Sequence, residues 1–283
     1  MISNKKEFEL GYAGLALLRN RLVGDKVLAG QIANEMSKLA DEINKESPSE
    51  SGAIKRHDVA SGYKAWSDTY DNNPNLLIEV EEPVVKSILK SFKKGKALDV
   101  ACGTGRYSRI LHDLGHKVIG VDNTPEMLQH AKSRVPKADF IHGDVEKLPI
   151  ANESVDLAIC ALVLTHLPSI DRTISELNRV VRLQGHIVLS DIHPWFVAIG
   201  GQAEFQDING EKGYIFNFVH QPSRYLGTFN KLGLKITQCV EPTLDSKRLE
   251  PSEMGINLNK KTIDTALEGL PLALVWVLEK SKN

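Results

Sequence analysis

The sequence predicts an α/β fold built on a mostly parallel sheet with helices on both of its faces. Two observations support this prediction. From about residue 80 onward, short apolar runs of strand character alternate with segments of helical character, which is the pattern of a parallel sheet. One of these runs, residues 157–163, is apolar at every position, as is usual for a strand buried on both faces. The length of 283 residues is sufficient for one large domain of this kind with additions.

The alternation gives the expected elements in order along the chain. Helices are expected over residues 80–92, 107–114, from 124 onward, over 169–182 and over 223–232. Strands are expected over residues 97–101, 117–121, 139–142, 155–162, 186–192, 235–240 and 273–279. Boundary residues support these limits, because Gly115 follows the second helix and Pro125 lies in the first turn of the third.

Residues 1–52 are expected to form a helical extension before the α/β domain of residues 53–283. Two helical segments, over residues 7–20 and 26–44, are followed by a polar linker. Glu7 and Glu9 directly precede the apolar stretch 10–18, which favours an amphipathic helix over a secretory signal. Two roles stay open for the extension: it covers the binding site, or it pairs two subunits into a homodimer.

An irregular segment is expected after residue 192, where the alternation stops. Residues 193–220 are rich in aromatic residues, histidine and glycine. Long irregular segments at the carboxyl end of a central strand are usually lids or binding loops. The sequence therefore predicts a lid over about residues 193–221.

Charge and cysteine content narrow the class of partner and the compartment. The net charge is −1 without long blocks of one sign, so neither a nucleic acid nor a membrane is expected as a partner. The longest run without a charged residue, 157–170, is shorter than the ~20 apolar residues of a membrane span. The three cysteines are far apart and lack metal-binding spacing, which favours a cytoplasmic protein without a metal site.

A glycine turn, Gly103-Thr104-Gly105, directly follows the strand expected over residues 97–101. Glycines at the carboxyl end of a parallel strand let the backbone approach a nucleotide-like ligand closely. Ser108 stands where the dinucleotide fingerprint has its third glycine, so the turn alone is a weak signal.

Three carboxylates accompany this turn at successive strands. Asp99 lies within the first strand, Asp122 ends the second, and Asp144 follows the third. Together they would repel a diphosphate, and they suit a ligand with a ribose, an amino group and a positive charge. Structural roles stay open as alternatives: a salt-bridge partner for Asp99, and helix caps for Asp122 and Asp144.

The motifs around these residues resemble the class I S-adenosylmethionine-dependent methyltransferases, specifically the type 11 and ubiquinone/menaquinone-biosynthesis-like group. The resemblance covers about residues 63–240. It depends on five segments in order: Leu98-Asp99-Val100-Ala101-Cys102-Gly103-Thr104-Gly105, Val118-Ile119-Gly120-Val121-Asp122, Gly143-Asp144-Val145-Glu146-Lys147-Leu148-Pro149, residues 154–159 and residues 182–191. It implies a Rossmann-like, seven-stranded sheet with an antiparallel last strand, and S-adenosyl-L-methionine as cofactor.

The resemblance also implies roles for individual residues. The glycines would pack against the methionine part of the cofactor, Asp122 would bind the ribose, and Asp144 with the Val145 backbone would bind the adenine. Tyr63 and Tyr70 match an N-terminal tyrosine placed over the donor, and for Tyr63 packing against the sheet stays open as an alternative. The expected cofactor set is Tyr63, Tyr70, Asp99, Ala101, Gly103, Gly105, Asp122, Asn123, Met127, Asp144, Val145 and Ala161.

Three histidines are candidates for a base or an acceptor-orienting group: His166, His193 and His220. His193 is preferred because it lies where related enzymes approach the methyl group. The alternative for His193 is a turn residue, and the alternative for His166 and His220 is a histidine that caps or packs. The residues expected to bind the acceptor are Trp195, Tyr214, Phe218, Arg224 and Tyr225. Alternatively, Tyr214 and Phe218 belong to one face of an ordinary strand.

The sequence therefore predicts a methyltransferase that moves a methyl group to oxygen, nitrogen or carbon of a small-molecule acceptor. One alternative is a non-catalytic or protein-directed S-adenosylmethionine-binding protein. Another is a nicotinamide-dependent oxidoreductase, which the missing third glycine and the acidic Asp144 disfavour.

Overall fold

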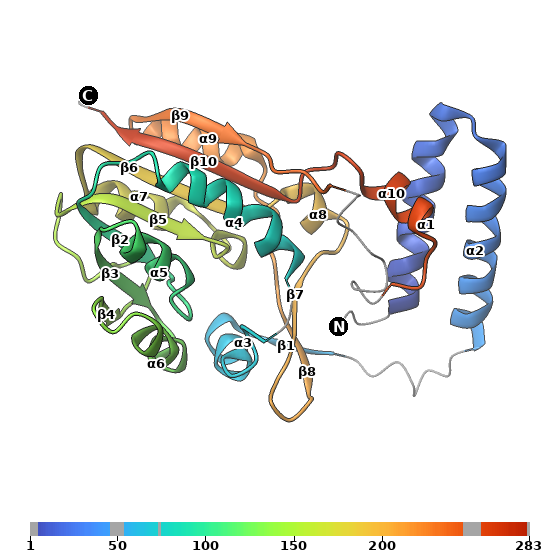
Figure 1. Cartoon of the computed structure of the whole chain (residues 1–283), viewed down its shortest axis with the longest axis horizontal. Helices are drawn as coiled ribbons and strands as arrows, with labels where there is room; N and C mark the ends of the chain where they lie inside the picture. Colours follow the sequence, from blue (N-terminus) through green and yellow to red (C-terminus); the bar gives the residue numbers. More distant parts are fainter. Residues whose placement is uncertain (1–4, 46–53, 73–74, 246–255, 282–283) are drawn as a thin grey trace. The chain divides into compact units, whose positions relative to one another are not determined.

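The computed structural model describes residues 5–45, 54–72, 75–245 and 256–281 of the chain. The chain divides into two compact units, each of which is described by itself (Figure 1). One unit contains residues 1–55 and 243–271, and the other contains residues 56–242 and 272–283. In the described ranges, no helix combines the length and the apolar character that a membrane span requires.

The smaller unit begins with two helices, α1 (Lys5–Val23) and α2 (Lys26–Lys45), that lie side by side (Figure 1). Gly24, with a φ of 76°, makes the turn between them. Asp25 caps α2, because its Oδ1 accepts hydrogen bonds of 3.0 Å from the backbone N–H groups of Val27 and Leu28. Both N-terminal helices are thus as predicted from the sequence.

A third helix of this unit, α10 (Lys260–Leu267), comes from far along the chain. Arg19 of α1 donates hydrogen bonds of 2.8 Å to the carbonyl oxygens of Ala266 and Glu268. This grouping differs from the single domain expected over residues 53–283, because residues 243–271 join the helices instead of the sheet. Sequence periodicity cannot reveal such an association, since the bonded residues are 247 and 249 positions apart.

The larger unit contains a seven-stranded sheet with the order β4-β3-β2-β5-β6-β10-β9. Strand β10 is antiparallel to both of its neighbours, and the pairs among β2 to β6 are parallel. The predicted fold class is confirmed. The strands are β2 (Lys96–Val100), β3 (Lys117–Asp122), β4 (Asp139–His142), β5 (Val155–Ala161), β6 (Val181–Ile192), β9 (Leu234–Val240) and β10 (Ala273–Lys280).

Helices cover both faces of this sheet, and β10 shows how. Val275 of β10 belongs to an apolar cluster with α4 (Leu76–Leu89) and α5 (Arg106–Asp113). The next residue, Trp276, belongs to the other cluster, with α7 (Asp171–Val180) and α9 (Pro222–Lys231). Successive side chains of a strand point to opposite faces, so the two clusters are the two layers of the core. Helix α6 (Pro125–Arg134) connects β3 and β4.

Two features of the larger unit differ from the sequence prediction. Helix α7 ends at Val180, and β6 begins at Val181 instead of residue 186 because buried Val181 pairs with Val155. The expected lid is not wholly irregular: it contains α8 (Pro194–Ala198), β7 (Ala203–Gln206) and β8 (Lys212–Ile215). Strands β7 and β8 form a hairpin, which β1 (Lys55–His57) extends to a three-stranded sheet.

Candidate functional site

The glycine turn after β2 faces open space on one side and a packed helix on the other. Gly103 has a φ of 53°, and a Cβ added there would meet no atom within 4 Å. Gly105 has a φ of 85°, and a Cβ there would lie 3.1 Å from Ala131 of α6. Gly103 therefore lines a space that a ligand can fill, whereas Gly105 is needed for the packing of α5 against α6.

Two non-glycine residues with positive φ lie at the same edge of the sheet. Ala101 directly follows β2 with a φ of 54°, and Leu162 directly follows the adjacent strand β5 with a φ of 57°. A left-handed conformation costs a residue with a side chain on the order of 1–2 kcal/mol. Strained residues of this kind are concentrated at ligand-binding sites. The two strand ends thus point to the same site as the glycine turn.

Asp122 joins this turn to the end of β3. It is 7% exposed, and its Oδ2 accepts a hydrogen bond of 2.8 Å from the Gly103 N–H. Its Oδ1 accepts a bond of 2.8 Å from the N–H of Thr124, which precedes α6. Burial raises the pKa of Asp122, and the two N–H groups oppose this shift. Each carboxylate oxygen keeps one further lone pair that a hydroxyl group can occupy.

Asp99 lies underneath the turn. It is 2% exposed, and its Oδ2 accepts a hydrogen bond of 2.7 Å from Ser108 Oγ of α5. Burial raises the pKa of Asp99 to about 7, and the Ser108 hydroxyl opposes this shift. In the structure this residue therefore positions α5 against β2.

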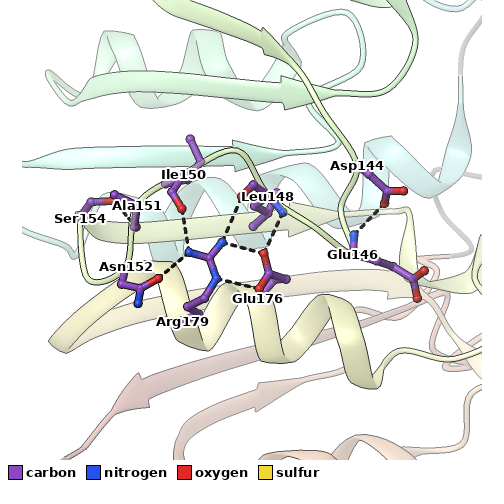
Figure 2. Close-up of polar contacts among 9 residues, drawn as sticks. All are labelled: Asp144, Glu146, Leu148, Ile150, Ala151, Asn152, Ser154, Glu176 and Arg179. Carbon is purple, nitrogen blue, oxygen red and sulfur yellow. Dashed lines mark hydrogen bonds and ion pairs between the residues drawn. The ribbon is translucent and has the colours of Figure 1, made fainter.

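Asp144 lies in the loop between β4 and β5, and Figure 2 shows how this loop is held. Asp144 is exposed, and its Oδ1 accepts a hydrogen bond of 2.8 Å from the Glu146 N–H. Arg179 of α7 donates to the carbonyl oxygens of Leu148 and Ile150 at 3.0 and 2.7 Å and pairs with Glu176 (Figure 2). Arg179 thus fastens the loop to the domain, a role that the sequence did not indicate.

Helix α3 (Val59–Trp66) brings Tyr63 towards the same edge, and Tyr70 follows it. Tyr63 stacks on Trp66 at 5.8 Å, and Trp66 contacts Tyr70 edge-on at 4.9 Å. Burial raises the pKa of both tyrosines, and the charge of Asp122 adds to the shift in each.

Polar contacts hold the segment of α3 and Tyr70 against the glycine turn and α6. Asp71 accepts a hydrogen bond of 3.1 Å from Thr104 Oγ1 and forms an ion pair of 2.5 Å with Arg134. Two further pairs join the segment to α6: Lys64 with Glu126 at 3.0 Å, and Asp68 with His130 at 3.4 Å. We call these three pairs, Lys64–Glu126, Asp68–His130 and Asp71–Arg134, the α3 clasp.

Of the three candidate histidines, His166 is the one in contact with this tyrosine cluster. It lies in the short helix η1 (Leu164–His166), it is 5% exposed, and its Nε2 is 2.9 Å from Tyr63 Oη. Its Nδ1 lies 3.4 Å from the carbonyl oxygen of Phe216, which can only accept. Nδ1 therefore carries the proton and Tyr63 donates to Nε2. Burial lowers the pKa of His166 to about 4.

His193 and His220 are held in structural contacts. His193 caps α8, because its Nδ1 accepts a hydrogen bond of 3.3 Å from the Trp195 N–H, and its Nε2 is 3.0 Å from Glu241. His220 Nε2 donates to the carbonyl oxygen of Leu167 at 2.8 Å. The structure thus places the preferred candidate, His193, at the N-cap of α8.

The expected acceptor residues do not come together as one group. Tyr225 is 3% exposed and stacks on Trp276 inside the core, and Arg224 is paired with Asp171 on the surface. Trp195 contacts Phe196 in α8, and Tyr214 lies in β8. Phe218 alone of the five lines a cavity of about 400 Å³, together with His166, Phe216, Ile215, Arg56 and His57.

Four members of the expected cofactor set, Met127, Asn123, Ala161 and Val145, make contacts within the protein. Met127 is 1% exposed and belongs to the core, so its side chain is enclosed by protein. Asn123 is exposed, and its carbonyl oxygen faces His142 Nε2 at 3.0 Å. Ala161 and Val145 are half-buried and pack against the apolar clusters of the sheet.

Two buried acids near this edge were not identified from the sequence. Asp191 ends β6, and its carboxylate accepts hydrogen bonds from the N–H groups of Thr165 and Ile192 at 2.7 and 2.8 Å. Burial raises the pKa of Asp191 to about 7. Glu81 is fully buried, accepts a hydrogen bond from Ser190 and pairs with Arg106 at 3.2 Å. Asp191 lies near the carboxyl end of a strand, and this position could have marked it as a site residue. Glu81 lies within the helix expected at 80–92, where an acid suggests only a solvent-exposed face.

These residues fit a cationic donor with a ribose. The Asp122 carboxylate lies beside the open space at Gly103, and an acid at this place disfavours a diphosphate and favours a sulfonium. Among the described residues, no cluster of histidine, cysteine and acidic side chains could hold a metal ion.

The sheet order, the antiparallel β10, the glycine turn and the acid at the end of β3 together define the class I S-adenosylmethionine-dependent methyltransferase fold. A family model described as a methyltransferase domain, of the type 11 group, matches residues 98–189. Residues 98–189 therefore belong to a methyltransferase domain of the class I, type 11 group, as the motifs predict.

Curated relatives include several malonyl-[acyl-carrier protein] O-methyltransferases. The protein from Yersinia pestis is 28% identical over 159 residues, which are 56% of this chain and 59% of the relative. The protein from Buchnera aphidicola subsp. Baizongia pistaciae is 29% identical over 192 residues, 68% of this chain and 72% of the relative. The chain spans 59% and 62% of the length of the relatives from Yersinia pestis and Serratia marcescens.

Solved structures share the fold. The S-adenosylmethionine-dependent methyltransferase from Mesorhizobium loti has a TM-score of 0.55 at 19% identity, and the match covers 71% of this chain and 97% of that chain. DhpI, in its complex with SAH, has a TM-score of 0.57 at 18% identity over 79% of this chain and 96% of that chain.

Proposed function

We propose that this protein is an S-adenosylmethionine-dependent methyltransferase that acts on a small-molecule acceptor. The observation that supports it most directly is the open space at Gly103, beside the Asp122 carboxylate and close to Tyr63. When bound, S-adenosylmethionine supplies an electrophilic methyl group, which an acceptor lone pair takes while the electrons of the broken carbon–sulfur bond stay with sulfur.

Four parts of the chain would hold the cofactor in this proposal. The backbone at Gly103 would lie against its methionine part, and the free lone pairs of Asp122 would accept the ribose hydroxyl groups. The loop at Asp144 and Val145, which Arg179 holds in place, would bind the adenine. Tyr63 and Tyr70 would close the site and exclude water.

His166 is better suited to orient Tyr63 than to serve as a base. With a pKa of about 4, protonation of His166 at neutral pH costs about 4 kcal/mol. An efficient general base has a pKa near the working pH. Tyr63, whose hydroxyl donates to Nε2, is held in one orientation by the neutral ring.

A carboxylate acceptor fits this arrangement, and O-methylation is therefore the form of the reaction that we favour. A carboxylate is deprotonated at neutral pH, so its methylation requires no base. The curated relatives named above are O-methyltransferases of a malonyl group on an acyl-carrier protein, which supports the same choice.

Cofactor binding tests the proposal, with S-adenosylhomocysteine as the probe in calorimetry. The wild type should bind it, and Asp122→Asn should weaken binding about 10- to 100-fold, since a hydrogen bond to a charged group contributes about 1.5–3 kcal/mol. Asp113→Asn is the matched control, because Asp113 is an exposed acid paired with Arg109 on α5. Equal affinity of Asp122→Asn and the wild type would remove Asp122 from the site.

Transfer itself is tested with labelled S-adenosylmethionine and fractionated metabolites, followed by mass identification of the product. A labelled methyl ester would support O-methylation, and a labelled amine or carbon product would contradict it. The absence of transfer to any metabolite, with cofactor binding intact, would favour the non-catalytic alternative.

The cytoplasmic location and a homodimer remain proposals. The three cysteines Cys102, Cys160 and Cys239 are all unpaired, which supports a reducing compartment.

A further inference from the structure

A cavity of about 400 Å³ lies beside the start of α3 in the larger unit. Its apolar wall includes Val59, Ile215, Phe216 and Phe218, and the last two rings meet edge-on at 4.9 Å. The polar residues at its wall include Arg56, His57 and His166. A volume of this size suits a small organic molecule.

His166 joins this cavity to the cofactor site. It lines the cavity, and its Nε2 is bonded to the Tyr63 hydroxyl at 2.9 Å. The ring of Tyr63 lies 6.1 Å from that of Tyr70, and the next residue, Asp71, accepts a hydrogen bond of 3.1 Å from Thr104 of the glycine turn. A molecule in the cavity would therefore lie one side chain away from the tyrosine that closes the donor site.

Arg56 supplies the cavity with a cation that is free to bind. Its guanidinium lies over the ring of Phe216 at 4.6 Å from the centroid. One face of the planar guanidinium stacks on this ring, so the N–H groups along the edge of the guanidinium are available to donate hydrogen bonds. Among the described residues, the Arg56 side chain has no ion pair or hydrogen bond, in contrast to the paired Arg106, Arg134 and Arg224.

The one acid at the cavity wall does not neutralise Arg56. Asp58 is the N-cap of α3, and its carboxylate accepts hydrogen bonds from the Ser61 N–H at 3.0 Å and Ser61 Oγ at 2.6 Å. Those bonds lower the pKa of Asp58 and keep its charge directed at the start of the helix. The edge of the Arg56 guanidinium is thus left for a ligand.

Phe216 connects Arg56 and His166 physically. The guanidinium of Arg56 stacks on the Phe216 ring, and the Phe216 carbonyl oxygen accepts a hydrogen bond of 3.4 Å from His166 Nδ1. The cation and the histidine are therefore placed by one residue at the end of β8, and the apolar walls lie beside them. This combination matches a ligand that has an acidic group and an apolar body.

We infer that this cavity is the acceptor site of the methyltransferase and that Arg56 binds a carboxylate of an acceptor with an apolar body. The identification of the ligand as the methyl acceptor rests on the proposed function, whereas the binding of an anion by Arg56 is argued from the cavity alone. Arg56 is a specificity-determining residue in this assignment, since a planar guanidinium binds a carboxylate through two parallel hydrogen bonds.

The test uses a pair of probes that differ in charge alone, 3-phenylpropionate and 3-phenylpropionamide, with the full-length protein labelled at its histidines for NMR. The acid should shift the imidazole signals of His57 and His166 in a saturable way, and the amide should bind at least about tenfold more weakly. Arg56→Gln should weaken binding of the acid at least about tenfold and leave binding of the amide unchanged. Arg172→Gln, which removes an exposed arginine of α7 away from the cavity, should behave as the wild type.

Equal binding of acid and amide by the wild type, or equal binding of the acid by wild type and Arg56→Gln, would overturn the inference. S-adenosylhomocysteine binding by the same samples separates this result from the proposed function. If the acid binds through Arg56 but the nucleoside fails to bind, the proposed function fails and the cavity is not an acceptor site. If the nucleoside binds equally to both proteins and the acid does not bind, only the inference fails.

Discussion

Gly103 and Gly105 allow one prediction to be worked out closely, because the structure gives the two glycines opposite surroundings. Both have positive φ, so alanine at either position costs about 1–2 kcal/mol in backbone strain. A Cβ at Gly103 meets nothing within 4 Å, so strain is the whole cost to folding. For a chain of this size, that loss lowers Tm by about 2–8 °C.

The two variants should differ in opposite ways: Gly103→Ala should lose more ligand affinity, and Gly105→Ala should lose more stability. In Gly103→Ala the methyl group enters the space where the cofactor approaches the backbone, so the affinity for S-adenosylhomocysteine should fall at least about tenfold, or 1.4 kcal/mol. In Gly105→Ala the methyl group lies 3.1 Å from Ala131, so stability should fall further than in Gly103→Ala.

Calorimetry with S-adenosylhomocysteine and thermal unfolding of both variants give the two measurements. Gly24→Ala is the matched control, because Gly24 also has positive φ and open surroundings but lies in the smaller unit. It should lose stability and keep its affinity. A folded Gly103→Ala protein with wild-type affinity would show that no ligand approaches the turn at this residue.

Three further variants test individual contacts. Tyr63→Phe leaves the buried His166 Nε2 without its partner, so the unfolding free energy should fall by about 1–3 kcal/mol in urea titrations, and no change would contradict the Tyr63–His166 bond. The pKa of Asp99 is about 7 in the folded state, and its ordinary value, 3.8, applies to the unfolded chain. Between these two values the folded protein keeps a proton that the unfolded chain releases. The unfolding free energy therefore falls as pH rises from about 4 to 7. Asp99→Asn should reduce that fall by up to about 4 kcal/mol, and an unchanged pH dependence would refute the assignment. Arg179→Gln should lower Tm and weaken S-adenosylhomocysteine binding together, because the loop that carries Asp144 loses its bonds at Leu148 and Ile150; loss of Tm alone would separate the loop from the adenine site.

The sheet was predictable because its strands are buried on both faces and therefore read as apolar runs. The same rule failed for the segment 193–221, whose short hairpin strands alternate weakly. A usable signal was present there, since Asn209-Gly210 is a typical hairpin turn and Gly210 has a φ of 85°. The association of α10 with α1 carries no local signal at all, because it depends on side chains at opposite ends of the sequence.

The cofactor side of the site was more predictable than the acceptor side for a related reason. Gly103 and Asp122 follow strands directly, so their place at the edge of the sheet follows from the order of elements. The residues of the proposed acceptor site come from β1, η1 and the end of β8, and their meeting depends on tertiary packing. Arg56 lies beside the linker and belongs to no sequence motif, so the sequence did not mark it. An aromatic residue such as Tyr225 has the same sequence pattern in a ligand pocket as in the core, where the structure places it.

The α3 clasp has a consequence for how ligands enter and leave. Its ion pairs join partly exposed side chains, and pairs of this kind contribute at most about 1 kcal/mol each. Loss of these pairs therefore removes weak contacts between the α3 segment and α6 and leaves the Tyr63–His166 bond and the sheet intact. Added salt screens such pairs, so the residence time of a bound nucleoside should shorten as ionic strength rises.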